Sequence, residues 1–241
     1  MTDTNQLGPI VENWAPPPRP QRDVLEGRYA RLEPISADVH AGDLFEANAE
    51  DTEGRIFKYL VDEPFASRSA YSRWVRKIEN LDDPMFFAVR NLESGRWSGV
   101  LSLMRINPEA GSIEVGNINF SPSLQQTRAA SEAIILTARQ AFQLGYRRFE
   151  WKCNALNIPS RRAAQRFGFS FEGVFRQALI VKGRNRDTAW FAMIDKEFPA
   201  LEAAYARWLD PENFRTDGQQ IRRLSDLTAP VLVARDPVLA S

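Results

Sequence analysis

The sequence predicts a mixed α/β layer fold. Two helical patterns come early in the chain, and three strand patterns separated by short turns follow them. The chain then alternates between strand and helix patterns and ends this series with two strands. Apolar residues make up 44% of the 241 residues, which is enough to bury a core and argues against global disorder.

The first half of the chain contains the two helices and a meander of three strands. Ser36 is suited to cap the first helix, because its hydroxyl can accept a hydrogen bond from the helix N-terminus. Turns that begin with Asn and end with Gly, at 91–95 and 107–111, separate the strands of the meander. We expect a short strand at 28–32, helices at 37–50 and 69–80, and strands at 85–90, 96–105 and 113–120.

The second half predicts alternating strands and helices. Pro159 suits the first turn of a helix, because its missing N–H would have no partner there, and Gly168 closes that helix. We expect a helix at 127–144, a strand at 149–153, a helix at 159–167, a hairpin of 170–181 with 187–194, and a helix at 198–209.

Composition divides the chain into three parts. Residues 1–26 form a polar, Pro-rich extension that we expect to be extended, with Trp14 as its anchor. Residues 27–197 hold the predicted domain. Residues 198–241 contain a helix, which could lie on the surface or face a second copy of the chain, and a poorly periodic tail.

Charge and cysteine content narrow the expected partners and compartment. Lys plus Arg equals Asp plus Glu, at 31 each, so no net charge indicates a nucleic-acid or membrane partner. Cys153 is the single cysteine and cannot form an internal disulfide, which fits a reducing compartment. Its apolar surroundings favour a buried thiol over a nucleophile. Without an apolar run that could span a bilayer or act as a signal peptide, we expect a cytoplasmic protein.

The segment 113–133 predicts a strand, a polar turn and the start of a helix. Pro122 ends the strand, because proline cannot donate to a sheet ladder and restricts the residue before it. The first N–H groups of the following helix lack partners within the helix and point toward the end of the strand. Such a place is suited to hold an anion, above all a phosphate.

Three ordered blocks of sequence resemble the GNAT superfamily of N-acetyltransferases, in particular its ribosomal-protein N-terminal acetylases. The turn contains Gln125-x-x-Arg128-x-Ala130, where the family has Gln/Arg-x-x-Gly-x-Gly/Ala. The other two blocks are Asn157-x-x-Ser160 and, after Gly168-Phe169, the segment Glu172-Gly173-x-x-Arg176. The resemblance covers roughly 28–196. It implies a central, mostly antiparallel, twisted sheet of about six to seven strands that is flanked by helices and splayed at the acyl-CoA site.

This resemblance implies acetyl-CoA as the co-substrate, with no metal. Main-chain groups at the end of the central strand would line the pantetheine arm, and the turn would bind the pyrophosphate. The implied cofactor-binding residues are Ile118, Asn119, Phe120, Gln125, Gln126, Thr127, Arg128, Ala129, Ala130, Asn157, Ser160 and Arg161.

Several of these residues also have structural interpretations. Asn157 could simply cap its helix, and Arg161 could belong to a solvated helix face. Arg128 stands where the family has Gly, which permits a close backbone approach and positive φ. Either Arg128 adds a charge for phosphate, or the cofactor site has degenerated.

Two residues are candidates for catalysis. Glu114 lies in the central strand and could accept the proton of the amine, directly or through water, if burial raises its pKa. It could instead be a solvent-facing strand residue. The resemblance to the ribosomal branch implies that Ser160 protonates the leaving thiolate or only hydrogen-bonds its sulfur, and Ala164 stands where many relatives have Tyr. His40, the single histidine, is expected on the surface.

The sequence therefore predicts an acyl-CoA-dependent N-acyltransferase that works by direct attack in a ternary complex. The acceptor would be a primary amine, on either a protein N-terminus or a small molecule, and the protein could form a homodimer. Two alternatives remain: a coenzyme-A-binding regulatory module without catalysis, and an interaction protein assembled through its terminal segments.

Overall fold

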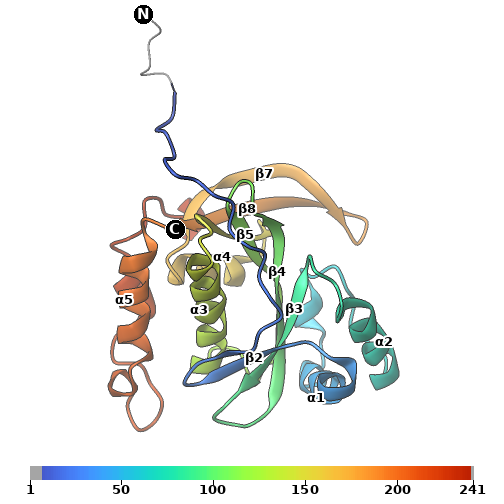
Figure 1. Ribbon diagram of the computed structural model, residues 1–241. Coiled ribbons are helices and arrows are strands. Elements are labelled where there is room, and N and C mark those ends of the chain that lie inside the picture. The colour runs from blue at the N-terminus through green and yellow to red at the C-terminus, as the bar shows by residue number, and fades with distance from the viewer. Residues whose placement is uncertain (1–6, 240–241) are drawn as a thin grey trace, which may run out of the picture.

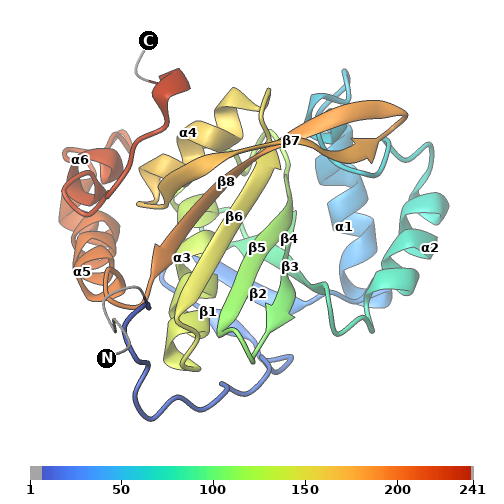
Figure 2. The ribbon, with the colours of Figure 1, turned by 90° about the horizontal axis from the view of Figure 1, so that it is seen from above.

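A twisted eight-stranded sheet runs through the centre of the computed structural model, which describes residues 7–239 (Figures 1 and 2). Its strand order is β1-β2-β3-β4-β5-β6-β8-β7. The strands are β1 (Leu25–Glu26), β2 (Ala30–Pro34), β3 (Met85–Asn91), β4 (Trp97–Asn107), β5 (Ser112–Phe120), β6 (Arg148–Asn154), β7 (Ser170–Val181) and β8 (Arg184–Ile194). The expected number of six to seven strands is exceeded by the two-residue β1, which the sequence analysis did not predict.

Within residues 7–239, all pairs of neighbouring strands are antiparallel except β5 and β6, which are parallel. These two parallel strands pair only from Ser112 with Arg148 to Val115 with Trp151. Beyond that point β5 stays paired with β4, and β6 stays paired with β8. The predicted splay between the central strands is therefore present. It begins where the short ladder between β5 and β6 ends, after Val115 and Trp151.

Helices cover both faces of the sheet. On one face lie α1 (Ala37–Ala49) and α2 (Arg68–Ile78), and the opposite face carries α3 (Arg128–Gln143) (Figure 2). Successive residues of β3 explain this arrangement, because Phe87 joins the core beside α3 while Phe86 joins the core beside α1 and α2. An apolar strand with both faces covered reads as a continuous hydrophobic run rather than an alternating one.

Glu132 in α3 ties the first strands to the centre of the fold. Its buried carboxylate accepts hydrogen bonds from the backbone N–H groups of Arg28, Tyr29 and Ala30, at 3.0, 2.6 and 2.8 Å. A Cβ on Gly27 would lie 2.3 Å from this side chain. Glycine there lets the backbone approach the carboxylate closely.

The C-terminal segment packs onto the domain. It contains α5 (Phe198–Leu209), the short helices η3 (Pro211–Asn213) and η4 (Pro237–Leu239), and α6 (Leu224–Thr228). Leu201 and Tyr205 of α5 are buried in the same core as α3, and the Tyr205 hydroxyl donates to the Phe167 carbonyl at 2.5 Å. Of the two predicted settings for this helix, the structure shows it against its own domain.

The N-terminal extension packs against the domain from Trp14 onward, whereas the described residues before it are exposed and extend away from the sheet (Figure 1). The Trp14 ring lies 5.8 Å from the Arg147 guanidinium, as expected of an anchor, and Arg22 donates to the carbonyls of Glu79 and Leu81 at 2.6 Å each. In residues 7–239 no helix combines the length and apolar character needed to cross a membrane. The division at 26 and 197 stays a prediction.

His40 corrects one prediction. It was expected on the surface, but it is buried against the Trp97 ring, with 4.4 Å between ring centroids. Its Nδ1 accepts a hydrogen bond from the Ser36 backbone N–H at 3.0 Å, and burial lowers the pKa of the imidazole. The helical pattern left the side of α1 that carries His40 undetermined, and packing against β4 decided it.

Candidate active site

The central strand changes direction where it parts from β6. Between its pairs with Ser102 and Val100 of β4, β5 contains one extra residue, and Asn117 there has a φ of 49°. This is a β-bulge, which bends a strand and re-aims its side chains. After the bulge Ile118 packs on the α3 core, while Asn119 is buried with its Oδ1 atom unpartnered among the described residues.

The turn after β5 is shaped by side chains as much as by backbone. The Gln125 amide donates to the Phe120 carbonyl at 2.8 Å, and Thr127 caps α3 by accepting from the Ala130 N–H at 3.1 Å. Gln126 takes the left-handed conformation, with a φ of 63°. Arg128 is simply the first helical residue, so its place does not require the positive φ for which Gly is suited.

Free backbone donors remain at the start of α3. Within residues 7–239, the N–H groups of Gln126, Arg128 and Ala129 donate to no protein atom, unlike that of Ala130. The Arg128 side chain turns aside to pair with Glu93 and lies over the rings of Tyr29 and Phe214. Free N–H groups and the helix dipole together make an anion site, which a pyrophosphate fits.

The mouth of α4 (Ile158–Arg166) places Ser160 beside β6. Asn157 caps this helix by accepting from the Ser160 N–H at 3.2 Å. The Ser160 hydroxyl accepts from the Trp151 indole at 3.0 Å, and its own hydrogen can be donated to a sulfur atom, as its hydrogen bond with the Cys153 side chain shows. Cys153 lies next to Ser160, and burial raises the pKa of its thiol, so the cysteine is not an activated nucleophile.

Arg161 points into the protein rather than toward a ligand. Its guanidinium is buried and donates twice to the carboxylate of Asp236, at 2.6 Å each, and once to the Ala155 carbonyl at 2.7 Å. All its nitrogens are engaged, so the geometry gives this side chain a structural role. The arginine cluster on α4 could not reveal this, because Asp236 lies in the aperiodic tail.

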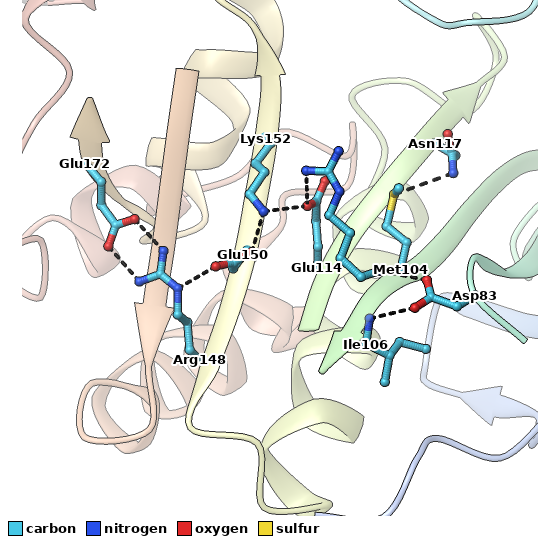
Figure 3. Close-up of polar contacts among 10 residues, drawn as sticks. Asp83, Met104, Ile106, Glu114, Asn117, Arg148, Glu150, Lys152 and Glu172 are labelled. Carbon is cyan, nitrogen blue, oxygen red and sulfur yellow. Dashed lines mark hydrogen bonds and ion pairs between the residues drawn. The ribbon is translucent and has the colours of Figure 1, made fainter. Parts of the chain in front are cut away.

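Glu114 is buried on the face of β5 away from α3 and belongs to a chain of charges whose ends are partly exposed (Figure 3). Its carboxylate lies 3.0 Å from the Lys152 ammonium and 3.3 Å from the Arg105 guanidinium. Lys152 also pairs with Glu150 at 2.6 Å, and Arg148 then connects Glu150 at 2.6 Å to Glu172 at 2.5 Å. We call these six residues the charge network: Arg105, Glu114, Arg148, Glu150, Lys152 and Glu172.

The network shifts the pKa values of its two buried carboxyl groups, Glu114 and Glu150, in opposite directions. Glu114 and Glu150 face each other directly across the parallel ladder, so they would repel without Lys152 between them. Burial raises the pKa of Glu114, although Lys152 and Arg105 oppose this effect. Burial acts in the same direction on Glu150, but its bonds from Arg148 and Lys152 outweigh it and lower the pKa of that carboxyl. Glu114 is thus the carboxylate that more readily holds a proton.

A small cavity lies next to Asn119, which is one of its lining residues. Two contacts, which we call the roof, join the segment 57–60 to other parts of the chain: the Tyr59 hydroxyl donates to the Leu156 carbonyl at 3.1 Å, and Lys182 at the β7–β8 tip donates to the Phe57 carbonyl at 2.9 Å. Burial raises the pKa of Asp62 in this cavity. The cavity is lined by Phe57, Leu60, Val61, Asp62, Trp74, Phe86, Asn117 and Asn119.

The family model of the acetyltransferase (GNAT) domain matches residues 30–170. The chain belongs to the GNAT acetyltransferase family. A solved GCN5-related N-acetyltransferase from Brucella melitensis is 48% identical, covers 91% of this chain and all of its own, and superposes with a TM-score of 0.89. Proteins of this family transfer an acetyl group from acetyl-CoA, so this protein is an N-acetyltransferase.

Other solved structures extend the comparison. A probable acetyltransferase of the GNAT family from Chromobacterium violaceum is 37% identical over 80% of this chain and 97% of its own, with a TM-score of 0.74. At 20% identity, over 71% of this chain and 99% of its own, an acetyltransferase from Salmonella typhimurium shares the fold with a TM-score of 0.61. That protein modifies the N-terminal serine of the 50S ribosomal subunit protein L7/L12. A search of the curated proteins found no match.

The structure groups the sequence candidates into three places. Residues 118–120 and the turn 125–130 lie along one path from the bulge of β5 to the start of α3. Ser160 lies at the mouth of α4, and Glu114 lies on β5 just before the splay. Sequence reasoning missed Trp151 and Lys152, the partners of Ser160 and Glu114, although a strand of alternating charge at 148–152 was a usable signal.

Proposed function

We propose that this acetyltransferase acylates a primary amine by direct attack in a ternary complex, with Glu114 as the general base. One observation carries the assignment. The last pair of the β5–β6 ladder joins Val115 to Trp151, and beyond it the two strands part. The buried Glu114 lies one residue before this pair. An amine that attacks a thioester must lose a proton, and a carboxylate beside the splay is placed to accept it.

The residues of the turn and the helix mouths would hold acetyl-CoA. The free N–H groups of Gln126, Arg128 and Ala129 suit the pyrophosphate, and the main chain of 118–120 suits the pantetheine arm. When bound, acetyl-CoA supplies the activated acetyl group. Ser160 can donate its hydroxyl hydrogen to the thiolate that leaves, in place of its bond with Cys153, since Trp151 already donates to its oxygen.

The charge network prepares Glu114 for proton transfer. Burial alone would keep the carboxyl protonated, whereas Lys152 and Arg105 favour the ionised form that a base requires. Ionised Glu114 can then take a proton from the ammonium, directly or through water. The neighbouring cations remain in place to stabilise the carboxylate when it is released for the next turnover.

The cavity under the roof is the proposed entrance for the acceptor. It combines an acidic group, Asp62, with the unpartnered Oδ1 of Asn119 and several apolar walls. An ammonium would be attracted by the carboxylate and could donate to the amide oxygen. This chemistry fits both an N-terminal amine of a protein and a small apolar amine, and it favours neither. The roof contacts of Tyr59 and Lys182 would have to open for either one.

The test is thiol release from acetyl-CoA in the presence of N-terminal peptides and small amines. Glu114→Gln should keep cofactor affinity and lose turnover by roughly 10²- to 10⁴-fold. Glu172→Gln is the matched control, because Glu172 lies at the far end of the same network, and its turnover should stay close to that of the unchanged protein. Full turnover in Glu114→Gln would remove Glu114 as the base.

A homodimer is also proposed, with the outer strand β7 as its contact. The edge of the sheet at β7 exposes Val174, Phe175, Leu179 and Ile180, and unpaired strand edges favour association. Sedimentation equilibrium of the unchanged protein and of Ile180→Lys would test it. A monomer at all concentrations would refute the dimer without affecting the acetyltransferase.

A further inference from the structure

A cavity of about 500 Å³ lies beside the start of α3, on the side away from the acceptor. Its size falls in the roughly 300–1,000 Å³ range of small-molecule sites. One wall is the phosphate-binding turn at 126–128, and the opposite wall comes from the C-terminal segment, where α5 and α6 lie next to α3 and α4 (Figure 2). The wall from the C-terminal segment consists of Trp208, Phe214, Gly218, Gln219, Gln220 and Arg223.

The charges around this cavity do not balance. Three arginines line it, Arg128, Arg166 and Arg223, against one carboxylate, Glu93. Glu93 pairs with Arg128. Among residues 7–239, Arg166 has no carboxylate partner, and the Arg223 side chain makes neither an ion pair nor a hydrogen bond. The cavity therefore carries two uncompensated positive charges.

Arg166 is held in place without being neutralised. Its guanidinium donates to the Ser131 hydroxyl at 3.1 Å and lies 5.0 Å from the Trp208 ring. Burial lowers the pKa of this guanidinium, which shows that the charged group has been partly removed from water. A desolvated cation without an anion costs folding free energy, so its retention beside a cavity points to an anionic ligand.

The same wall offers flat apolar surfaces. The Trp208 indole is fixed by donating to the Gln220 side chain at 2.8 Å, and Phe214 packs edge-on against it at 5.3 Å. Trp208 is 3% exposed and supports this wall, whereas Phe214 is half-buried and can contact a base, whose polar edge the amide groups of Gln219 and Gln220 can recognise. Basic side chains beside an aromatic ring in one cavity are the combination that a phosphorylated nucleoside requires.

We propose that the C-terminal segment completes the acetyl-CoA site by binding the 3′-phosphorylated adenosine end of the coenzyme. This inference rests on the proposed placement of the pyrophosphate at Gln126, Arg128 and Ala129. The adenosine and its 3′-phosphate are joined directly to the pyrophosphate, and the cavity begins at the same residues. Arg166 and Arg223 bind the 3′-phosphate, and Phe214, supported by the buried Trp208, contacts the adenine.

The segment that supplies this wall lies outside the matched family domain, which ends at residue 170. The main chain of the turn can hold any pyrophosphate, because backbone N–H groups do not distinguish what is attached to it. Selection of coenzyme A over thioesters that lack the nucleotide therefore falls to the C-terminal segment. Short pantetheine thioesters should be poor acetyl donors for this protein.

The experiment is calorimetric titration of the full chain with coenzyme A, with dephospho-coenzyme A and with adenosine 3′,5′-bisphosphate. The unchanged protein should bind coenzyme A about tenfold or more tightly than the dephospho form, and the bisphosphate should compete for the site. Arg223→Gln should abolish most of that preference while changing dephospho-coenzyme A affinity little. Arg222→Gln is the matched control, because Arg222 is the exposed neighbour outside the cavity, and it should keep the full preference.

Two results would overturn the inference. One is equal affinity for the two coenzymes in the unchanged protein, and the other is a preference that survives both Arg223→Gln and Arg166→Met. Either result leaves the proposed transfer intact, since coenzyme A still binds. If neither coenzyme binds, the proposed pyrophosphate site at Gln126, Arg128 and Ala129 fails as well. Turnover of acetyl-CoA then shows whether the transfer reaction itself is retained.

Discussion

The molecule contains two groups of charged side chains that differ in how they are neutralised. In the charge network of β4 to β7, every carboxylate lies within 3.3 Å of a cation. In the C-terminal cavity, two arginines have no carboxylate partner in the described chain. The charge network centres on β5 and β6, whereas the cavity lies beside the turn at 126–128.

This difference separates two uses of charge. A fully paired network holds its members in fixed positions and sets the protonation of Glu114, so its value lies in the protein without ligand. Unpaired cations instead raise the free energy of the protein without ligand and recover that cost when an anion arrives. Removal of Lys152 should therefore lower the stability of the protein without ligand, whereas removal of the partly buried Arg166 should not.

The largest effect is expected for Lys152→Met. The ammonium is 6% exposed and is the only network cation between Glu114 and Glu150, which face each other. Its removal leaves two buried carboxylates facing each other and should lower the free energy of unfolding by about 3–5 kcal/mol. Urea denaturation of the protein without cofactor measures this loss.

Arg105→Gln provides the control. Arg105 bonds the same carboxylate, but its side chain is 46% exposed, so the loss should be no more than about 1 kcal/mol. Similar losses in the two variants would show that the network is not organised around Lys152.

The pH dependence of turnover sharpens the role of Glu114. A base must be ionised, so kcat/KM should fall about tenfold per unit as the pH drops below the pKa of this carboxyl. Because burial raises that pKa above its ordinary value of 4.5, the fall should begin at a higher pH than for an exposed Glu. Glu114→Gln should lose this limb of the profile. A limb that persists in the variant would belong to the acceptor amine.

Predictions from the sequence were most reliable where local chemistry decides the structure. The turn after β5 and the caps of α3 and α4 follow from Thr127, Asn157 and the residues around them. Pro122, Pro159 and Gly168 marked element boundaries that the structure shows within a few residues. The family resemblance then supplied the splay, which no local pattern encodes.

Other features depend on residues far apart in the chain and were not predictable. Asp236 meets Arg161 across 75 positions, and this pair turns a candidate phosphate ligand into a structural residue. The wall of the cavity likewise comes from the tail, where periodicity was weak. His40 was misplaced for the same reason, because only the packing of α1 on β4 decides which side of that helix is buried.

The cavity predicts a change of opposite sign from that of the network. Arg166→Met keeps the apolar stem beside Trp208 and removes an uncompensated, partly desolvated charge. Without cofactor, stability should stay unchanged or rise by up to about 1–2 kcal/mol. Chemical denaturation with and without coenzyme A tests this, since the variant should also gain less stability from the cofactor. If Arg166→Met instead lost as much free energy of unfolding as Lys152→Met, the contrast between the cavity and the charge network would be wrong.

The smallest change should come from Arg223→Gln. The side chain is exposed and bonds to no other described residue, so the free energy of unfolding without cofactor should shift by less than about 0.5 kcal/mol. With saturating coenzyme A, its thermal midpoint should lie below that of the unchanged protein, because a weaker ligand stabilises the folded state less. Equal midpoints with coenzyme A would mean that Arg223 makes no contact with it. A residue that is neutral for folding and matters only with ligand present is what an incomplete anion site predicts.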